Sequence, residues 1–154
     1  MLICCLISLF FFLAFIISFM IVKHCPVSLS ATYYETEKKW AFPVTLGICA
    51  SLITAPMFDV TPDNFRCLVF LTIAGALFVS ASPAFHDGLD KPIHYTSAAV
   101  MTGAIIAWII LMGYVPYLII LGGLSGLIFR EYIVYLFELG LLANLYFVLI
   151  VMLV

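Results

Sequence analysis

The chain has 154 residues, of which 66% are hydrophobic and only 9% are charged. A soluble domain carries about 25% charged residues, because its apolar surface must be hidden from water in one core. The composition therefore excludes an ordinary water-soluble domain and favours a protein of the lipid bilayer. The formal net charge is −2 and no basic run occurs, which argues against a nucleic-acid partner.

The apolar runs predict helices rather than the strands of a barrel. In lipid, every backbone polar group must be hydrogen-bonded within the protein, so only helices and closed barrels span a membrane. Barrel strands are short and alternate apolar with polar positions. The runs here are continuous and about twenty residues long, which is the length of a transmembrane helix. We predict an all-α polytopic integral membrane protein, with a bundle of about six transmembrane helices in a single domain, 1–154.

The first span is predicted at residues 1–22 and ends at Lys23 and His24. It lacks the basic start and the small-residue cleavage site of a signal peptide, so we expect a retained helix. The polar segment 23–39, KHCPVSLSATYYETEKK, follows, and Pro26 prevents the helix from continuing. Its hydroxyls and aromatic rings suit a loop among the lipid headgroups, and a flap over a cavity is the alternative.

Five further spans follow, at residues 40–58, 67–85, 93–112, 117–129 and 132–154. Small residues occur in the middle of the third span, around Gly75, and throughout the first half of the fourth. The short fifth span carries Gly122 and Gly126 in a GxxxG spacing. Small residues allow helices to approach closely in lipid, so these positions indicate helix–helix contacts.

The distribution of lysine and arginine predicts an orientation. Five of these six residues lie in the loops after the first, third and fifth spans: Lys23, Lys38, Lys39, Lys91 and Arg130. Arg66 alone follows the second span. Because cytoplasmic loops are enriched in lysine and arginine, we expect a multi-pass protein of the cell membrane with both termini outside. The loops that carry His24, His86 and His94 would then be cytoplasmic.

The most polar interruption in the second half of the chain is the segment 80–96, SASPAFHDGLDKPIHYT. Its candidate catalytic residues are Ser82, His86, Asp90 and His94. Ser82 and His86 share a helix face if the third helix continues that far. Two interpretations stay open: a functional cluster, and a polar turn with interfacial histidines in which Asp90 caps the fourth helix.

Glu138 lies within the apolar sequence of the last span. A carboxylate inside the hydrocarbon is costly and normally faces a partner or a water-filled cavity. Glu131, Tyr135 and Glu138 follow at helical spacing and share one face. They are the candidates for a ligand site or for a proton or ion path, and a structural hydrogen bond between helices is the alternative. We expect Glu138 to point into the bundle.

The sequence does not favour a metal site. A catalytic zinc ion normally has three protein ligands and one water. The candidate ligands are His24, His86 and His94, but no HxxxH or HExxH pattern occurs. The five cysteines are scattered without a CxxC pair. We therefore predict no bound metal and no cofactor.

Two resemblances to known families accompany these patterns. The runs SLSATYYETEKKWAF, LFVSASPAF and IHYTSAAVMTG are similar to small uncharacterised multi-pass membrane proteins of bacteria and their phages. That similarity implies a fold and no chemistry. The step from Ser82 to His86 resembles the Ser-x-x-x-His element of the membrane hydrolase superfamily of alkaline ceramidases and progestin/adiponectin receptors. It implies a zinc-dependent hydrolase of seven spans, whose late HxxxH is absent here.

Three functional classes stay open, and whether the protein is an enzyme is undecided. The first is a binding, sensing or accessory membrane protein, with membrane lipids as partners and a homo-oligomer as an option. The second is a small transporter or channel whose polar path includes Glu138. The third is a membrane-embedded lipid hydrolase that uses Ser82, His86 and His94.

Overall fold

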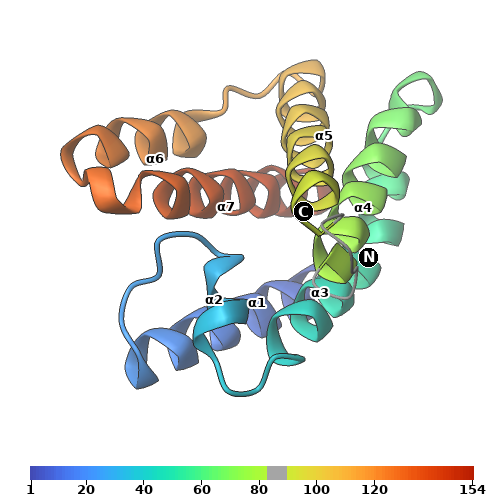
Figure 1. Ribbon diagram of the computed structural model, residues 1–154. Helices are drawn as coiled ribbons and strands as arrows, with labels where there is room; N and C mark the ends of the chain where they lie inside the picture. Colours follow the sequence, from blue (N-terminus) through green and yellow to red (C-terminus); the bar gives the residue numbers. More distant parts are fainter. Residues whose placement is uncertain (83–89) are drawn as a thin grey trace.

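The computed structural model describes residues 1–82 and 90–154 of the chain. All the regular elements of this part are helical, which confirms the prediction of an all-α fold (Figure 1). The α-helices are α1 (Leu2–Val22), α2 (Ala31–Glu35), α3 (Ala41–Val60), α4 (Arg66–Ala81), α5 (Asp90–Leu111), α6 (Tyr117–Ile128) and α7 (Ile133–Leu153). Two short 3-10 turns, η1 (Asp63–Phe65) and η3 (Arg130–Tyr132), precede α4 and α7.

Within the described residues, five helices are long and apolar enough to cross a membrane: α1, α3, α4 with its 3-10 turn, α5 and α7. The predicted fifth span, residues 117–129, is shorter than the others, as expected. The α6 helix has 12 residues. It is therefore about 18 Å long, which is shorter than the hydrocarbon core of a bilayer at about 30 Å. Its length is set by Pro116, which directly precedes it, and by the polar break at Arg130 that follows Phe129. In this part of the chain, the prediction of about six spans, the fifth of them short, thus corresponds to five long apolar helices and one short one.

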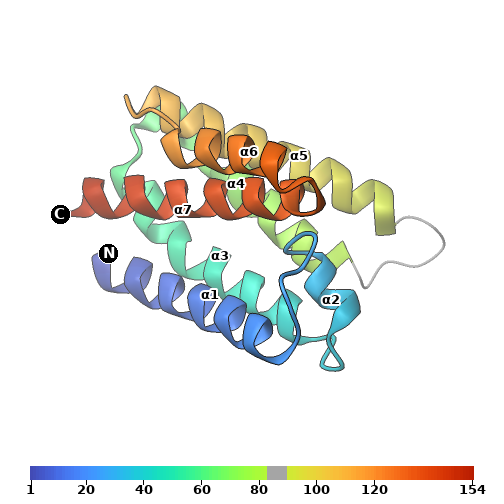
Figure 2. The ribbon, with the colours of Figure 1, turned by 90° about the vertical axis from the view of Figure 1, so that its left-hand side faces the viewer.

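The helices pack in antiparallel succession. α1 packs on α3, α3 on α4, α4 on α5, and α6 on α7, while α7 also contacts α1, α3 and α5. Both termini lie at one end of the bundle, whereas α2 and the turn between α6 and α7 lie at the other (Figure 2). The α2 helix was not expected, because the segment 23–39 reads as an irregular polar loop.

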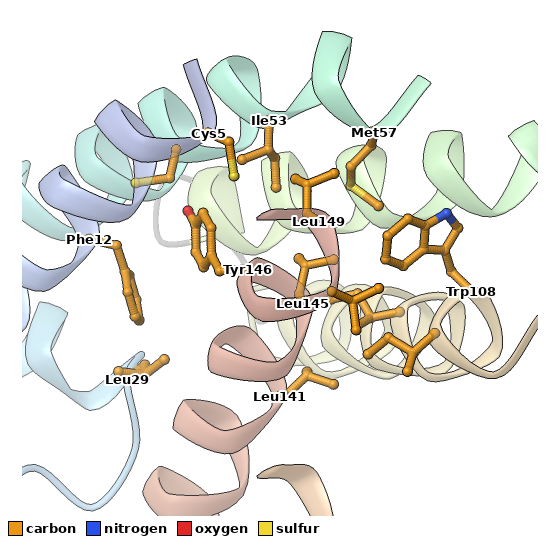
Figure 3. Packing of buried hydrophobic residues seen from close by; sticks show 14 of the residues in the cluster. Cys5, Phe12, Leu29, Ile53, Met57, Trp108, Leu141, Leu145, Tyr146 and Leu149 are labelled. Carbon is orange, nitrogen blue, oxygen red and sulfur yellow. The ribbon is translucent and has the colours of Figure 1, made fainter. Parts of the chain in front are cut away.

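The core forms where α7 meets α1, α3 and α5 (Figure 3). Leu145 and Leu149 of α7 lie to one side of Met57 of α3 and Trp108 of α5 in this view, and all four are buried. The hydroxyl of Tyr146, also on α7, points towards α1 near Cys5 (Figure 3). Burial of side chains from four different helices explains why α7 is the central helix of the bundle.

Buried hydroxyls join the helices within this core. The indole N–H of Trp108 donates a hydrogen bond to Thr61 Oγ1 at 2.8 Å, which ties α5 to the end of α3. Ser8 Oγ of α1 donates to the carbonyl oxygen of Cys49 at 3.1 Å. Since a hydroxyl has one hydrogen, the 2.6 Å contact between Ser8 Oγ and the Tyr146 hydroxyl uses the tyrosine as donor. These bonds satisfy polar groups that would otherwise be costly to bury.

The glycines of the predicted GxxxG lie against α7. A Cβ on Gly122 would overlap the carbonyl oxygen of Leu136, and one on Gly126 would lie 2.8 Å from Ile133 Cα. Gly140 of α7 approaches Leu118 of α6 in the same way. The first turn of α6 is also held by Asn144, whose Oδ1 accepts the backbone N–H of Leu118 at 2.9 Å. The α6–α7 pair is therefore a direct backbone contact, as the glycine spacing indicates.

Candidate functional site

The segment between α1 and α3 is attached to the first turns of α7 by two hydrogen bonds. The backbone N–H of Tyr135 donates to the carbonyl oxygen of Val27 at 3.2 Å. This N–H is one of the donors that the start of a helix leaves without an intrahelical partner. The backbone N–H of Leu29 donates in turn to Glu138 Oε2 at 2.7 Å. The side chain of Leu29 is buried in the core beside α7 (Figure 3). We call residues 27–34 the strap.

A cavity of about 880 Å³ lies at this end of the bundle. The strap, α5 and the beginning of α7 supply most of its lining. From the strap come Val27, Ser28, Ser30, Ala31, Tyr33 and Tyr34; from α5 come Lys91, His94, Tyr95, Ala98, Ala99, Thr102 and Gly103; from η3 and α7 come Glu131, Val134, Phe137 and Glu138; Phe42 and Ser82 complete it. Part of the segment 23–39 thus lines a cavity, which is compatible with either interpretation of that segment.

The small residues of α5 leave the space for the cavity. Ala98, Ala99 and Gly103 form its α5 wall together with Thr102. A Cβ built on Gly103 would meet no atom within 4 Å, so the helix has no close neighbour there. Gly75 of α4 behaves in the opposite way, because its added Cβ would lie 2.8 Å from Met101 Cβ on α5. One side of α5 thus packs closely on α4 while another borders empty volume.

A smaller pocket of about 60 Å³ adjoins the cavity and is lined in part by core residues of the bundle. It shares Ser30, His94, Thr102 and Glu138 with the large cavity, along with Phe42 and Ala98. Its remaining lining is apolar except for Thr45: Phe12, Phe15, Ile16, Leu29, Leu46, Val79, Met101, Leu141 and Leu142. Glu138 and His94 therefore lie at the boundary between a polar entrance and an apolar interior.

Ser82 and His94 form a hydrogen-bonded pair at the cavity wall. Ser82 Oγ lies 3.0 Å from His94 Nδ1, and it also donates to the carbonyl oxygen of Val79 at 2.8 Å. A hydroxyl has one hydrogen, so the bond to Val79 leaves His94 Nδ1 as the donor to Ser82. A nucleophilic serine requires the opposite direction, with the histidine accepting the hydroxyl hydrogen. In this arrangement, the Ser82 hydroxyl accepts a hydrogen bond from His94 and so orients the imidazole ring.

Four of the residues expected to be functional meet at this cavity: Ser82, His94, Glu131 and Glu138. Glu138 is half-buried and its carboxylate faces into the bundle, as expected for a carboxylate in an apolar helix. Tyr135 does not line the cavity, in contrast to Glu131 and Glu138. Its buried hydroxyl donates to Met20 Sδ on α1 at 3.5 Å, so the predicted stripe does not act as one surface.

The other candidates are not brought together by the described residues. His24 lies away from the cavity lining, where its Nε2 is 3.7 Å from Glu35 Oε2 and its side chain is 72% exposed. α5 begins at Asp90, but the side chain of Asp90 lies outside the described residues, as does His86. The expected proximity of His86 to His94 therefore stays a prediction. Among the described residues, no three histidine, cysteine or acidic side chains lie close enough together to hold a metal ion. The absence of a bound metal stays a prediction from the sequence.

Several residues that line the cavity or the inner pocket could not be recognised as site residues from the sequence. The Leu29 N–H that meets Glu138 is a backbone group, and residue type does not mark it as a donor. Phe42 and Phe137 read as ordinary apolar positions of two different spans. Apart from these residues and the candidates named above, the tyrosines of the strap stand out in the sequence, as interfacial aromatics.

Comparison of the chain with protein-family models, with curated proteins and with solved structures gave no match. The fold and the site by themselves define the class. This is a helical protein with five apolar helices of membrane-spanning length among its described residues and a cavity with a polar entrance at one end.

Proposed function

We propose that this chain is a multi-pass membrane protein that binds a small amphipathic molecule in the cavity under the strap. The single observation behind the proposal is the about 880 Å³ cavity, which has charged and hydroxyl groups at its entrance and leads to an apolar pocket. Ligand sites are typically concave and mostly apolar, with a few convergent polar groups. This function belongs to the class of binding, sensing or accessory membrane proteins.

The membrane location is supported by the outer surface of the bundle. Large apolar side chains of α1 and α6 point away from the protein, among them Ile3, Phe10 and Ile21 of α1 and Leu124 and Ile128 of α6. So many exposed large apolar side chains are unusual on water-soluble monomers and indicate contact with lipid or partners. Membrane lipids are the partners that such a surface fits.

The proposed topology places both termini outside and the cavity at the cytoplasmic face. It is tested with two single-cysteine variants in a background whose native cysteines are alanine. Glu37→Cys lies between α2 and α3 at the cavity end, and Asn64→Cys lies in η1 at the other end; both positions are exposed. On intact cells, a membrane-impermeant maleimide should label Asn64→Cys and not Glu37→Cys. The reverse pattern would contradict the orientation, and labelling of both would contradict a spanning bundle.

The cavity is tested by filling it. Gly103→Phe would place a ring where no atom lies within 4 Å, in the cavity wall. Gly123→Phe is the matched control, since Gly123 of α6 is equally open but does not line the cavity. The probes are three hexyl compounds with different head groups, hexyltrimethylammonium, hexanesulfonate and 1-hexanol, titrated calorimetrically into protein in an uncharged maltoside detergent.

At least one of these probes should bind the parent protein saturably, and Gly103→Phe should weaken that binding by about tenfold or more, which is about 1.4 kcal/mol. The reason is steric, because the ring occupies the volume that the ligand needs. Gly123→Phe should leave the affinity unchanged. The proposal is rejected if none of the probes binds saturably, or if the two variants behave alike.

The two other functional classes have weaker support. A transport path through Glu138 would need polar groups beyond it, but the inner pocket continues with apolar residues such as Leu141 and Leu142. A lipid hydrolase could use the Ser82–His94 pair, whose 3.0 Å separation suits a nucleophile and its base. The hydrogen bond from Ser82 to Val79 opposes that role. We therefore place ligand binding before transport, and transport before hydrolysis.

A further inference from the structure

We infer that the molecule bound in this cavity carries an ammonium group on an apolar body, with the ammonium placed at Glu138. This inference rests on the proposed function, because it assigns the chemistry of the ligand to the same cavity. It is carried by the position of one carboxylate, by the aromatic lining and by the balance of charges around the cavity.

Glu138 lacks a counter-ion among the described residues. Its Oε2 accepts the Leu29 N–H at 2.7 Å. The ion pairs found in the described chain join His24 to Glu35 and Arg66 to Asp63, and neither involves Glu138. The carboxylate nevertheless lines both the cavity and the apolar pocket behind it. A carboxylate in such a place is costly unless a cation accompanies it, and a ligand in the cavity can supply that cation.

Aromatic rings surround the same volume. Phe42 lines both the cavity and the inner pocket with Glu138, and Phe137 lines the cavity next to it along α7. The faces of aromatic rings attract cations, most strongly where water is excluded. The strap already shows this chemistry, since Lys39 Nζ lies 5.3 Å from the ring centre of Tyr33 and 5.9 Å from that of Tyr34. Carboxylate and rings together form the surroundings that an amine or a quaternary ammonium group prefers.

The remaining charges of the lining also favour a cation. Lys91 and Glu131 are both exposed and line the entrance, whereas Glu138 is the half-buried one. Among the described lining residues there are thus two carboxylates and one lysine, and the most buried of these three charges is negative. An anionic head group would have to approach Glu138 without compensation, which costs free energy in a site of low polarity.

Two sources could provide an ammonium on an apolar body: a free lipophilic amine, and the head group of a zwitterionic phospholipid. In the second case, the adjacent phosphate would be near Lys91 at the entrance. Hexylphosphocholine separates the sources, because it has the chain and the ammonium of hexyltrimethylammonium together with a phosphate. Tighter binding of hexylphosphocholine, lost in Lys91→Gln, would indicate the phospholipid. Tighter binding of hexyltrimethylammonium would indicate the free amine, and either result supports an ammonium site.

The deciding experiment compares head groups on one chain length in the maltoside detergent. Hexyltrimethylammonium should bind the parent about tenfold or more tightly than 1-hexanol or hexanesulfonate. Glu138→Gln should remove that preference while it keeps an oxygen for the Leu29 N–H. Glu37→Gln is the matched control, because it makes the same change of charge at an exposed position outside the cavity lining. It should leave the preference intact.

The possible failures are distinguishable. If 1-hexanol or hexanesulfonate binds as tightly as the ammonium probe and Gly103→Phe still abolishes binding, the cavity binds ligands and the ammonium assignment is overturned. An ammonium preference that survives in Glu138→Gln overturns the placement at Glu138. Absence of saturable binding by every probe rejects the proposed function itself. The preference measured on the parent protein needs no variant, so it stays informative even if Glu138→Gln does not fold.

Discussion

Gly140→Ala should lower the free energy of unfolding by about 1–3 kcal/mol, the usual cost of forcing extra volume into a packed contact. The added methyl group would overlap the carbonyl oxygen of Leu118, which belongs to the backbone of α6 and cannot rotate away. The helices would have to separate, and the bond from Leu118 N–H to Asn144 would lengthen with them. Equilibrium unfolding in mixed micelles of maltoside and dodecyl sulfate measures the loss.

Gly123→Ala is the control for the packing of α6. Its added methyl group would meet no atom within 4 Å, so only the intrinsic preference of a helix for alanine remains. That preference favours alanine by about 0.5–1 kcal/mol. The two substitutions should therefore change stability in opposite directions, although both replace a helical glycine by alanine. Equal stability of Gly140→Ala and the parent would contradict the backbone contact between α6 and α7.

Glu138→Leu should release the strap from α7. The substitution leaves the Leu29 N–H without its acceptor, and hydrogen bonds to charged groups contribute about 1.5–3 kcal/mol. Opening of the strap should then become about ten to a hundred times more frequent, since 1.4 kcal/mol corresponds to a factor of ten. Hydrogen–deuterium exchange of the peptide that contains Leu29 measures this directly.

Two further variants separate the hydrogen bond from other effects of the substitution. Glu138→Gln retains a neutral carbonyl oxygen for the Leu29 N–H, so exchange should increase much less than in Glu138→Leu. Glu131→Leu removes a carboxylate from the same cavity lining, but none of the hydrogen bonds or ion pairs in the described residues joins Glu131 to the strap. It should not accelerate exchange at Leu29. Unchanged exchange in Glu138→Leu would show that the strap is held by its other contacts.

These expectations connect stability to function at one place. Residues of the strap line the cavity, and Glu138 both accepts the Leu29 N–H and provides the charge that we propose to face the ligand. A ligand that pairs with the carboxylate would therefore influence the same contact that holds Leu29.

The long apolar runs determined the helices, because about twenty consecutive apolar residues in lipid leave the backbone no alternative. The pattern of Gly122 and Gly126 also predicted a close contact, since a missing side chain allows backbones to meet whatever the partner helix is. The isolated carboxylate of Glu138 likewise indicated an inward position, because lipid cannot replace the water that solvates a carboxylate.

Only the tertiary structure decided what these residues meet. Nothing in the sequence pairs Leu29 with Glu138, because the donor is a backbone N–H and the separation is 109 residues. Gly75 of α4 and Gly103 of α5 look alike in the sequence, because both are glycines in an apolar helix. In the structure, Gly75 packs closely against α5, whereas Gly103 borders a cavity. Tyr135 shares a helix face with Glu138 but reaches Met20 of α1, because α1 lies beside α7 at that level. A local pattern specifies which side of a helix is unusual, whereas its neighbour is set by the packing of the whole bundle.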